Sequence, residues 1–297
     1  MNLSALRERL LVDLVRWAPK GTFSRLVGFC AKRSLPRAIR EPLYRAFAER
    51  VGADLGEVER PLADYDSLDA FFTRRLRPGV RPIADGEGVV VSPCDGTLSA
   101  CGTAVDGELI QAKGRDYRVR DLVCDETAAA RFEGGTYVTI YLAPRDYHRV
   151  HAPLDGRVTG FHHLPGAFFP VNPLAVKHVD ALFTRNERLI TYLDTEAGEC
   201  AVVMVAATGV GHMTVTYDAV ETHQPGRGRK QARERLSSPR PLARGEELGT
   251  FHLGSTVVLL FEPGRVKLES LAAGARIRLG EPIARRVSTA ARGDAAA

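Results

Sequence analysis

The chain has 297 residues, of which 44% are hydrophobic and 26% are charged, and its formal net charge is +5. This length and composition allow one large domain, or one domain with an appendage, around a sizeable core. The few aromatic residues do not alternate with basic ones, which excludes a typical nucleic-acid-binding surface. Five cysteines without a C-x-x-C pair argue against both a disulfide framework and a zinc site.

Residues 1–84 are predicted to form a helical region that associates with a membrane. Apolar residues recur at helical spacing in the first stretch: Leu3, Leu6, Leu10, Leu14 and Trp17. A second helix is expected around residues 23–29, and a third from Pro36 to Gly52 that kinks or restarts at Pro42. Apolar faces flanked by Arg and Lys suit an anionic membrane surface, and packing on the protein's own core is the alternative. No apolar run approaches the roughly 20 residues of a spanning helix, so we expect a peripheral association.

Residues 65–83 join this region to the next. Ser67 is expected to cap a short helix that carries paired phenylalanines. A basic cluster follows the helix: Arg74, Arg75 and Arg77.

Residues 85–284 are predicted to form a mainly antiparallel, β-rich catalytic domain of the sandwich or barrel type, giving an α+β fold. Short β-branched and apolar runs at 89–91, 137–142, 201–205 and 257–261 are separated by Gly, Pro and Asp turns. One short helix is expected near 119–122. We predict an exposed basic loop at 224–236 and a disordered tail at 285–297.

Four places in the β region carry candidate chemistry. Asp95 lies in an Asp-Gly turn, which alone is a common turn pair. His148 and His151 lie between Pro144 and Pro153, and we expect a turn or helical loop there, because an extended strand would point them to opposite faces. Their spacing permits a metal site, but no third ligand is evident, so no metal is predicted.

The other two places are a proline-rich stretch and a glycine–serine pair. Phe168 and Phe169 lie among three prolines and suit an apolar pocket wall. Gly254 has no Cβ, so its carbonyl can be approached closely, and the Ser255 hydroxyl next to it could attack that carbonyl. The alternative is a glycine bulge leading into a core strand.

Together these stretches resemble one family, the bacterial phosphatidylserine decarboxylase proenzymes, over nearly the whole chain. The resemblance is carried by residues 65–83 and by five short motifs: Ser92-Pro93-Cys94-Asp95-Gly96, Pro144-Arg145-Asp146-Tyr147-His148-Arg149-Val150-His151, Phe168-Phe169-Pro170-Val171-Asn172-Pro173, Asn186-Glu187-Arg188, and Phe251-His252-Leu253-Gly254-Ser255-Thr256.

The resemblance implies a precursor that cleaves itself between Gly254 and Ser255 into a β chain, 1–254, and an α chain, 255–297. It assigns this step to a triad of Asp95, His151 and Ser255, in which histidine takes the hydroxyl proton. Ser255 becomes a pyruvoyl group, the cofactor of the mature enzyme. The substrate amine forms a Schiff base with that group, which accepts electrons as carbon dioxide leaves.

The resemblance further implies that His148 protonates the decarboxylated substrate and that phosphatidylserine becomes phosphatidylethanolamine. The candidate substrate-binding residues are Phe168, Phe169, Asn172, Arg145, Arg149 and Lys177. We expect a complex of α and β chains, a homodimer, bound peripherally to the cytoplasmic side of the cell membrane. A zinc hydrolase on a β-sandwich and a non-catalytic membrane-associated binding protein are the alternatives.

Overall fold

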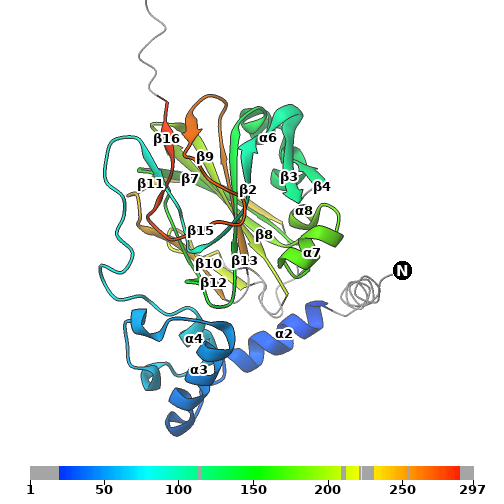
Figure 1. Cartoon of the computed structure of the whole chain (residues 1–297). Helices are drawn as coiled ribbons and strands as arrows, with labels where there is room; N and C mark the ends of the chain where they lie inside the picture. The colour runs from blue at the N-terminus through cyan, green and yellow to red at the C-terminus, as the bar shows by residue number, and fades with distance from the viewer. Residues whose placement is uncertain are drawn as a thin grey trace, which may run out of the picture.

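The computed structural model describes residues 20–112, 115–208, 212–220, 222, 231–252 and 255–287. Its first part is helical and lies below the β-rich body in Figure 1. The elements are α2 (Lys20–Ala31), α3 (Arg37–Val51), the 3-10 turns η1 (Leu55–Glu57) and η2 (Leu62–Asp64), and α4 (Leu68–Phe72). The helix predicted over residues 3–17 lies outside the described residues.

Helix α3 begins after Pro36 and ends at Gly52, as predicted. Gly52 adopts the left-handed conformation with φ 77°, which favours glycine, and its N–H bonds the Ala48 carbonyl. We expected this helix to kink or restart at Pro42; it does not restart, because α3 is continuous through that residue. Proline removes one backbone hydrogen bond, while Tyr44 and Ala48 are buried on the turns that follow and hold them in place.

The helical part has a small core of its own. The ring of Tyr44 stacks on Phe71, with centroids 4.7 Å apart, and Tyr65 meets the same Phe71 edge-on. Ser67 caps α4 by accepting a hydrogen bond from the Ala70 N–H, as predicted. The phenylalanine pair after Ser67 is therefore buried and fixes the segment that follows it.

From residue 89 onward the chain is mainly strand, and every pair of strands described is antiparallel. The strands predicted at 89–91, 137–142, 201–205 and 257–261 are confirmed. The strands are β1 (Val89–Val91), β2 (Gly96–Thr103), β3 (Glu108–Ala112), β4 (Arg115–Arg118), β5 (Thr136–Leu142), β6 (Arg149–His151), β7 (Gly156–Leu164), β8 (Arg188–Thr195), β9 (Gly198–Ala206), β10 (His212–Val215), β11 (Ala232–Leu242), β12 (Glu247–His252), β13 (Ser255–Phe261), β14 (Val266–Leu268), β15 (Arg276–Ile277) and β16 (Pro282–Arg286).

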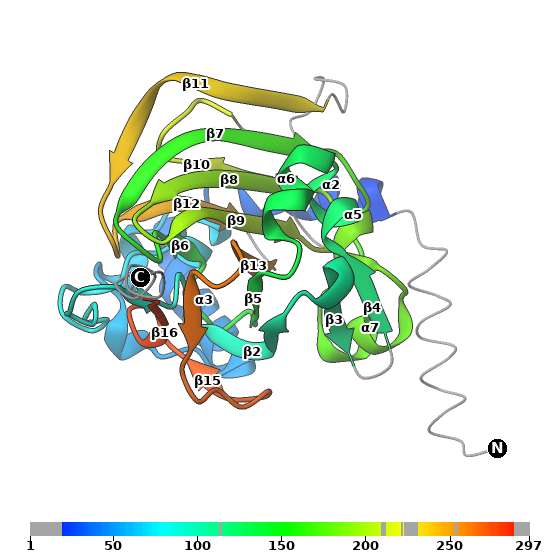
Figure 2. The same ribbon diagram turned by 90° about the horizontal axis from the view of Figure 1, so that it is seen from above.

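One large curved sheet organises the body, in the order β11-β7-β8-β9-β13-β5-β2-β15 (Figure 2). One face packs against the small sheets β10-β12-β6 and β1-β16-β14. The other face is covered by the hairpin β3-β4 and by α5 (Val119–Val123), α6 (Glu126–Phe132), α7 (Pro173–His178) and α8 (Leu182–Arg185). The fold is therefore an α+β sandwich, as predicted, and the described strands do not close into a barrel.

Strand β13 lies in the middle of the large sheet and is buried on both faces. Val257 and Leu259 lie in the core shared with the small sheets, and Val258 and Leu260 lie in the core under the helices. A strand covered on both faces reads as a continuous apolar run, which explains the pattern seen in the sequence.

Three expectations for the β region need correction. The described residues of this region form four α-helices, α5 to α8, where one was predicted. One of them starts at Pro173 and is capped by Asn172, so proline begins regular structure there. Residues 232–236 of the predicted basic loop belong to β11, which pairs with β7; residues 224–230 lie outside the description. The last strand continues to Arg286, past the expected start of the tail at 285.

Candidate active site

Ser255 is the first residue of β13 and lies between two neighbouring strands. It pairs with Leu142 of β5 and with Ala206 of β9. Its side chain is on the same face as Val257, two residues along, and so faces the core shared with the small sheets. The residue is fully buried, and its Oγ has no hydrogen-bond partner among the residues that the structure describes. A buried hydroxyl without a partner is rare and needs an explanation.

The link before Ser255 passes from one sheet to the other. Strand β12 ends at His252 in the sheet β10-β12-β6, and β13 begins at Ser255 in the large sheet. Residues 253 and 254, which include the expected cleavage-site Gly254, lie outside the described residues. The predicted scissile bond therefore belongs to a two-residue connection between strands of different sheets.

His148 lies in the extended stretch just before β6. Its backbone carbonyl accepts a hydrogen bond from the Phe251 N–H, which places it opposite Phe251 on the face of the small sheet that packs against the large one. Its ring contacts the Phe72 ring, with centroids 4.1 Å apart. Its Nδ1 lies 2.8 Å from the Asp146 carbonyl, so Nδ1 carries the hydrogen, and the buried Nε2 has no partner. Burial lowers the pKa of His148 to about 4, so the ring is neutral at pH 7.

His151 is the last residue of β6 and has different surroundings. Its Nδ1 lies 2.9 Å from the Gly245 carbonyl, and its buried Nε2 also has no partner. Burial lowers the pKa of His151, while the nearby negative charges of Glu247 and Asp95 act in the opposite direction. The single loop expected to carry both histidines is not present, because the turn ends before Tyr147 and residues 149–151 form a strand. Val150 lies in the inter-sheet core, so His151 points to the opposite face of that strand.

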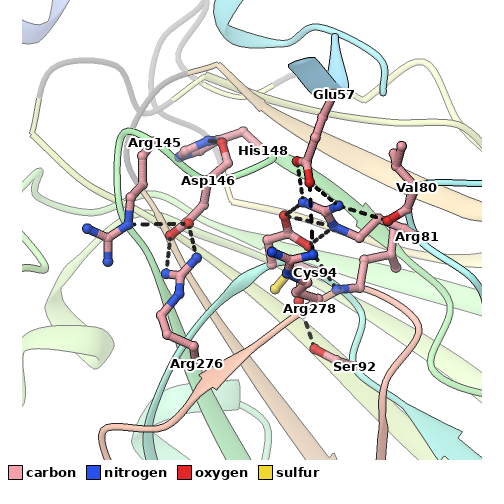
Figure 3. Close-up of polar contacts among 12 residues, drawn as sticks. Glu57, Val80, Arg81, Ser92, Cys94, Arg145, Asp146, His148, Arg276 and Arg278 are labelled. Carbon is pink, nitrogen blue, oxygen red and sulfur yellow. Dashed lines mark hydrogen bonds and ion pairs between the residues drawn. The ribbon is translucent and has the colours of Figure 1, made fainter. Parts of the chain in front are cut away.

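Asp95 lies in the turn between β1 and β2 and is bound from the helical part of the chain. Arg81 places Nε 2.8 Å from Oδ1 and Nη2 2.6 Å from Oδ2 of this carboxylate, and the Leu279 N–H donates to Oδ1. The same guanidinium also binds both oxygens of Glu57 (Figure 3). The hydrogen bonds of Asp95 thus go to Arg81 and Leu279, and the hydrogen bond of the His151 ring goes to Gly245.

The expected apolar wall is divided between the two cores. Phe168 lies in the core that contains Val257, and Phe169 lies in the core under the helices, where Arg185 covers its ring at 4.7 Å. Asn172 caps α7 through its side chain. Lys177 is exposed in the last turn of that helix, where basic residues favour the helix dipole.

Asn186 fastens the phenylalanine segment beside Ser255. Its Oδ1 accepts from the Phe169 N–H, and its Nδ2 donates to the carbonyls of Phe169 and Ala206. Ala206 is the strand neighbour of Ser255. The side-chain amide of Asn186 is fully buried, and both its oxygen and its nitrogen are hydrogen-bonded. The Asn-Glu-Arg stretch thus helps to position the backbone beside Ser255.

A polar cleft of about 340 Å³ opens where the helical part meets the β body. Figure 3 shows Asp146 between Arg145 and Arg276, with Arg276 Nη2 2.6 Å from Asp146 Oδ1. Arg145 is partly exposed, with Nε 3.8 Å from Asp146 Oδ1. Arg149, by contrast, is engaged by the two oxygens of Glu247 at 2.7 and 2.8 Å.

Sequence reasoning missed several residues that line this cleft: Glu57, Arg74, Arg81, Asp146 and Arg276. The sequence held one signal for Arg74: only Thr73 separates it from the buried Phe71-Phe72 pair. A charged residue so close to a buried aromatic pair has little room to reach open solvent.

The described residues contain no group of three or more His, Cys, Asp or Glu placed to share a metal ion. None of the helices described is long and apolar enough to cross a bilayer.

Comparison with known proteins identifies the family. The family model described as phosphatidylserine decarboxylase matches residues 68–285. A phosphatidylserine decarboxylase proenzyme from Anaeromyxobacter sp. (strain K) is 48% identical over 279 residues, covering 94% of this chain and 99% of the relative. Proenzymes of the same name from Myxococcus xanthus (strain DK1622) and Brevibacillus brevis (strain 47 / JCM 6285 / NBRC 100599) are 46% and 38% identical; they cover 94% and 93% of this chain, and the matches span 99% and 98% of those proteins. These matches leave no support for the zinc hydrolase or the non-catalytic binding protein. The chain belongs to the phosphatidylserine decarboxylase family.

Proposed function

We propose that this protein is a proenzyme that cleaves itself between Gly254 and Ser255 and then converts phosphatidylserine to phosphatidylethanolamine, as a carboxy-lyase. Family membership supports the reaction. The observation that carries the proposal is the Ser255 hydroxyl, which is buried at the start of a central strand without a hydrogen-bond partner. A nucleophile needs a free hydroxyl next to the carbonyl it attacks, and the preceding residue is glycine.

In the proposed cleavage, Ser255 Oγ attacks the Gly254 carbonyl carbon and the peptide becomes an ester. Elimination across the Ser255 Cα–Cβ bond then releases the Gly254 carboxylate and leaves dehydroalanine, which tautomerises and loses ammonia on hydrolysis to give the pyruvoyl group. The base must accept the hydroxyl proton at an imidazole nitrogen that carries no hydrogen. The family resemblance assigns this role to His151, whose Nδ1–H is directed to Gly245 and whose Nε2 has no partner among the described residues. Its side chain lies on the face of β6 opposite to Val150, so it must turn toward Ser255 to reach the hydroxyl.

Asp95 is assigned to the same step as the group that stabilises the protonated histidine. Its charge raises the pKa of His151, against the larger effect of burial. In the uncleaved chain its hydrogen bonds go to Arg81 and Leu279. We therefore propose that Asp95 acts on His151 through its charge in this state, without a direct hydrogen bond.

The residues around Ser255 fit a pyruvoyl group formed in place, because Ser255 is held by strands on both sides and its side chain has no other partner. Once formed, the group supplies an electron-withdrawing carbonyl for the substrate amine. His148 is assigned the protonation of the decarboxylated substrate. Since a pKa of about 4 leaves His148 neutral, it must first gain a proton, and a bound anion would favour that.

Both chains should stay together after cleavage. Strand β13 pairs with β5 on one side and β9 on the other, and cleavage with loss of the Ser255 nitrogen leaves every pair from Thr256 to Leu260 intact on both sides. We propose that the resulting complex of a β chain, 1–254, and an α chain, 255–297, forms a homodimer.

We propose that residues 1–84 hold the enzyme peripherally on the cytoplasmic face of the cell membrane, with residues 85–284 as the catalytic domain. Large apolar side chains are exposed on α2 and α3: Leu26, Phe29, Ile39 and Leu43. The end of α2 lies near the cleavage-site link, because Lys32 Nζ is 3.2 Å from His212, whose ring lies against His252. A membrane bound by these helices would thus lie close to Ser255.

The experiment that tests this function is turnover by purified protein. With phosphatidylserine in detergent micelles, the unaltered protein should release carbon dioxide and form phosphatidylethanolamine. Ser255→Ala should form none. Absence of product from correctly cleaved, folded protein would contradict the substrate assignment.

A further inference from the structure

Arg74 is a buried arginine that forms no ion pair with any other described residue, and its guanidinium lies 5.3 Å from the centre of the Phe71 ring. Only 3% of its surface is exposed. Its Nη2 lies 3.2 Å from the Arg145 carbonyl, while Nε and Nη1 are buried without a hydrogen-bond partner. A buried guanidinium normally satisfies its donors, because leaving a buried charged group unpaired is costly.

The other arginines around Arg74 all have carboxylate partners. The cleft is lined by five arginines and four carboxylates: Arg74, Arg81, Arg145, Arg276, Arg278, Asp54, Glu57, Asp95 and Asp146. Arg81 pairs with Asp95 and Glu57, Arg145 and Arg276 pair with Asp146, and Arg278 lies 3.9 Å from Glu57. Among the residues that the structure describes, Arg74 forms no such ion pair. The residues that line the cleft therefore carry one excess positive charge, and Arg74 is the arginine among them without an ion pair in the described part of the chain.

Arg74 lies beside His148. It follows the phenylalanine pair of which Phe72 contacts the His148 ring, and its positive charge is one cause of the lowered pKa of His148, after burial and against the hydrogen bond to Asp146. An anion bound to Arg74 would offset this charge close to the imidazole.

The chemistry of the reaction indicates which anion belongs there. A cation bound to the substrate carboxylate would stabilise the charged ground state. That stabilisation is lost in the transition state, as neutral carbon dioxide leaves, so such a cation would slow decarboxylation. A phosphodiester keeps its negative charge throughout, so a cation bound to it costs nothing in the transition state. Arginine also donates readily to phosphate oxygens, and Nε and Nη1 of Arg74, which lie on different edges of the guanidinium, are donors without a partner among the described residues.

We infer that Arg74 binds the phosphodiester of the lipid substrate, through a guanidinium donor that has no partner among the described residues. This inference rests on the proposed function. It also gives the bound substrate a role in protonation, since the phosphodiester would make His148 a better proton acceptor before it acts as a donor.

The test is binding to the full-length Ser255→Ala protein, which needs neither cleavage nor turnover. Calorimetry would compare dihexanoyl-phosphatidylethanolamine, which has the phosphodiester but no carboxylate, with dihexanoylglycerol, N-acetylserine and inorganic phosphate. Arg74→Met should weaken binding of the phospholipid roughly 10- to 100-fold, because a hydrogen bond to a charged group is lost. It should leave the binding of dihexanoylglycerol unchanged. The matched control is Arg75→Met, which removes a neighbouring exposed arginine and should change neither.

Unchanged phospholipid binding by Arg74→Met would overturn the inference. If Arg74→Met weakened only the binding of N-acetylserine, Arg74 would bind the substrate carboxylate and the inference would be wrong. If inorganic phosphate bound as tightly as the phospholipid, the site would be one for free phosphate, which would also overturn the inference. If Arg74→Met does not fold, the same binding measurement is made on Arg74→Lys, and an NMR titration of His148 provides a second test of the inference. Saturating phospholipid should raise the pKa of His148 in the Ser255→Ala protein, and no change would contradict the inference. If turnover fails in the unaltered enzyme while these binding differences hold, the proposed function falls and the anion site remains.

Discussion

Arg81 binds the carboxylate of Asp95 through two nitrogens, with Nε 2.8 Å from Oδ1 and Nη2 2.6 Å from Oδ2. The side chains of both residues are almost completely buried, with exposed fractions of 9% and 4%. Arg81 also binds Glu57, so one guanidinium connects the helical part of the chain to the turn that carries Asp95. The helical region therefore fixes the position of a residue assigned to self-cleavage.

Replacing Arg81 by methionine should destabilise the protein by about 3–5 kcal/mol, because Asp95 is left buried and without its partner. Urea denaturation in the Ser255→Ala background, where the chain is uniform, measures this loss. The matched control is Arg37→Met, which removes an exposed ion pair with Asp64 and should cost less than about 1 kcal/mol. Equal losses for the two variants would show that the Arg81–Asp95 pair does not hold the turn.

Stability should fall with acidity because of His148. Its pKa is about 4 in the folded chain and near 6.5 when unfolded, so the unfolded state takes up the proton first as the pH falls. The contribution is fully present above pH 6.5 and is lost as the pH falls toward 4. Between pH 7 and pH 5 it amounts to about 2 kcal/mol.

This is measured by denaturant unfolding of Ser255→Ala at both pH values, beside the same protein carrying His148→Gln. The histidine protein should lose about 2 kcal/mol more than the glutamine protein over that range. An identical loss in both would mean that His148 is charged, or solvated, in the folded chain.

The sequence predicted the fold class well because local patterns were sufficient for it. The run Val257–Phe261 is apolar at every position, and a strand buried on both faces requires that pattern. The helix does not restart at Pro42, and the burial of Tyr44 and Ala48 that supports the continuous α3 is a tertiary effect absent from local sequence. The same holds for residues 232–235, three of which are charged but which form part of an edge strand that pairs with β7.

The candidate site was less accessible to sequence reasoning. Ser255 and the histidines were identified by their motifs, but the partner of Asp95 was not. Arg81 and Asp95 are 14 residues apart, and nothing in the intervening sequence indicates that an arginine of the helical part would reach this turn. Ion pairs between separate elements depend on how those elements dock, which periodicity and spacing do not encode.

The two histidines should separate maturation from turnover. His151→Ala and Asp95→Asn should remain mostly single chains, since the base and its stabilising charge are lost. His148→Ala should still cleave at least partly, and its cleaved form should lose decarboxylation by about 10²–10⁴-fold. A denaturing gel measures cleavage, and carbon dioxide release from labelled lipid measures turnover per cleaved chain.

The control for these variants is His178→Ala, in the outer helix α7, which should cleave and turn over normally. Full cleavage of His151→Ala would remove His151 from the base role. An uncleaved His148→Ala would transfer that role to His148, whose Nε2 is equally free and whose side chain lies on the face toward the large sheet.

Membrane binding should depend on the apolar side chains exposed on α2 and α3. Changing Leu26, Phe29, Ile39 and Leu43 to serine should reduce pelleting with anionic vesicles at least about 10-fold, because the apolar area available for insertion is lost. Added salt should weaken pelleting of the unaltered protein. The matched control is Val105→Ser with Ile110→Ser, two exposed apolar residues of the β body, which should pellet normally. Equal losses in both variants would contradict a helix-borne membrane site.

The central claim is that the chain breaks itself at Ser255, and intact-mass measurement of the purified protein tests it most directly. The unaltered protein should give two chains, one ending at Gly254 and one beginning at residue 255 with a terminal pyruvoyl group in place of serine. Ser255→Ala should give one chain with the full mass, since alanine offers no nucleophile. Ser255→Cys should cleave slowly, because a thiolate also attacks acyl carbon. Two chains from Ser255→Ala, broken at the same bond, would contradict the account.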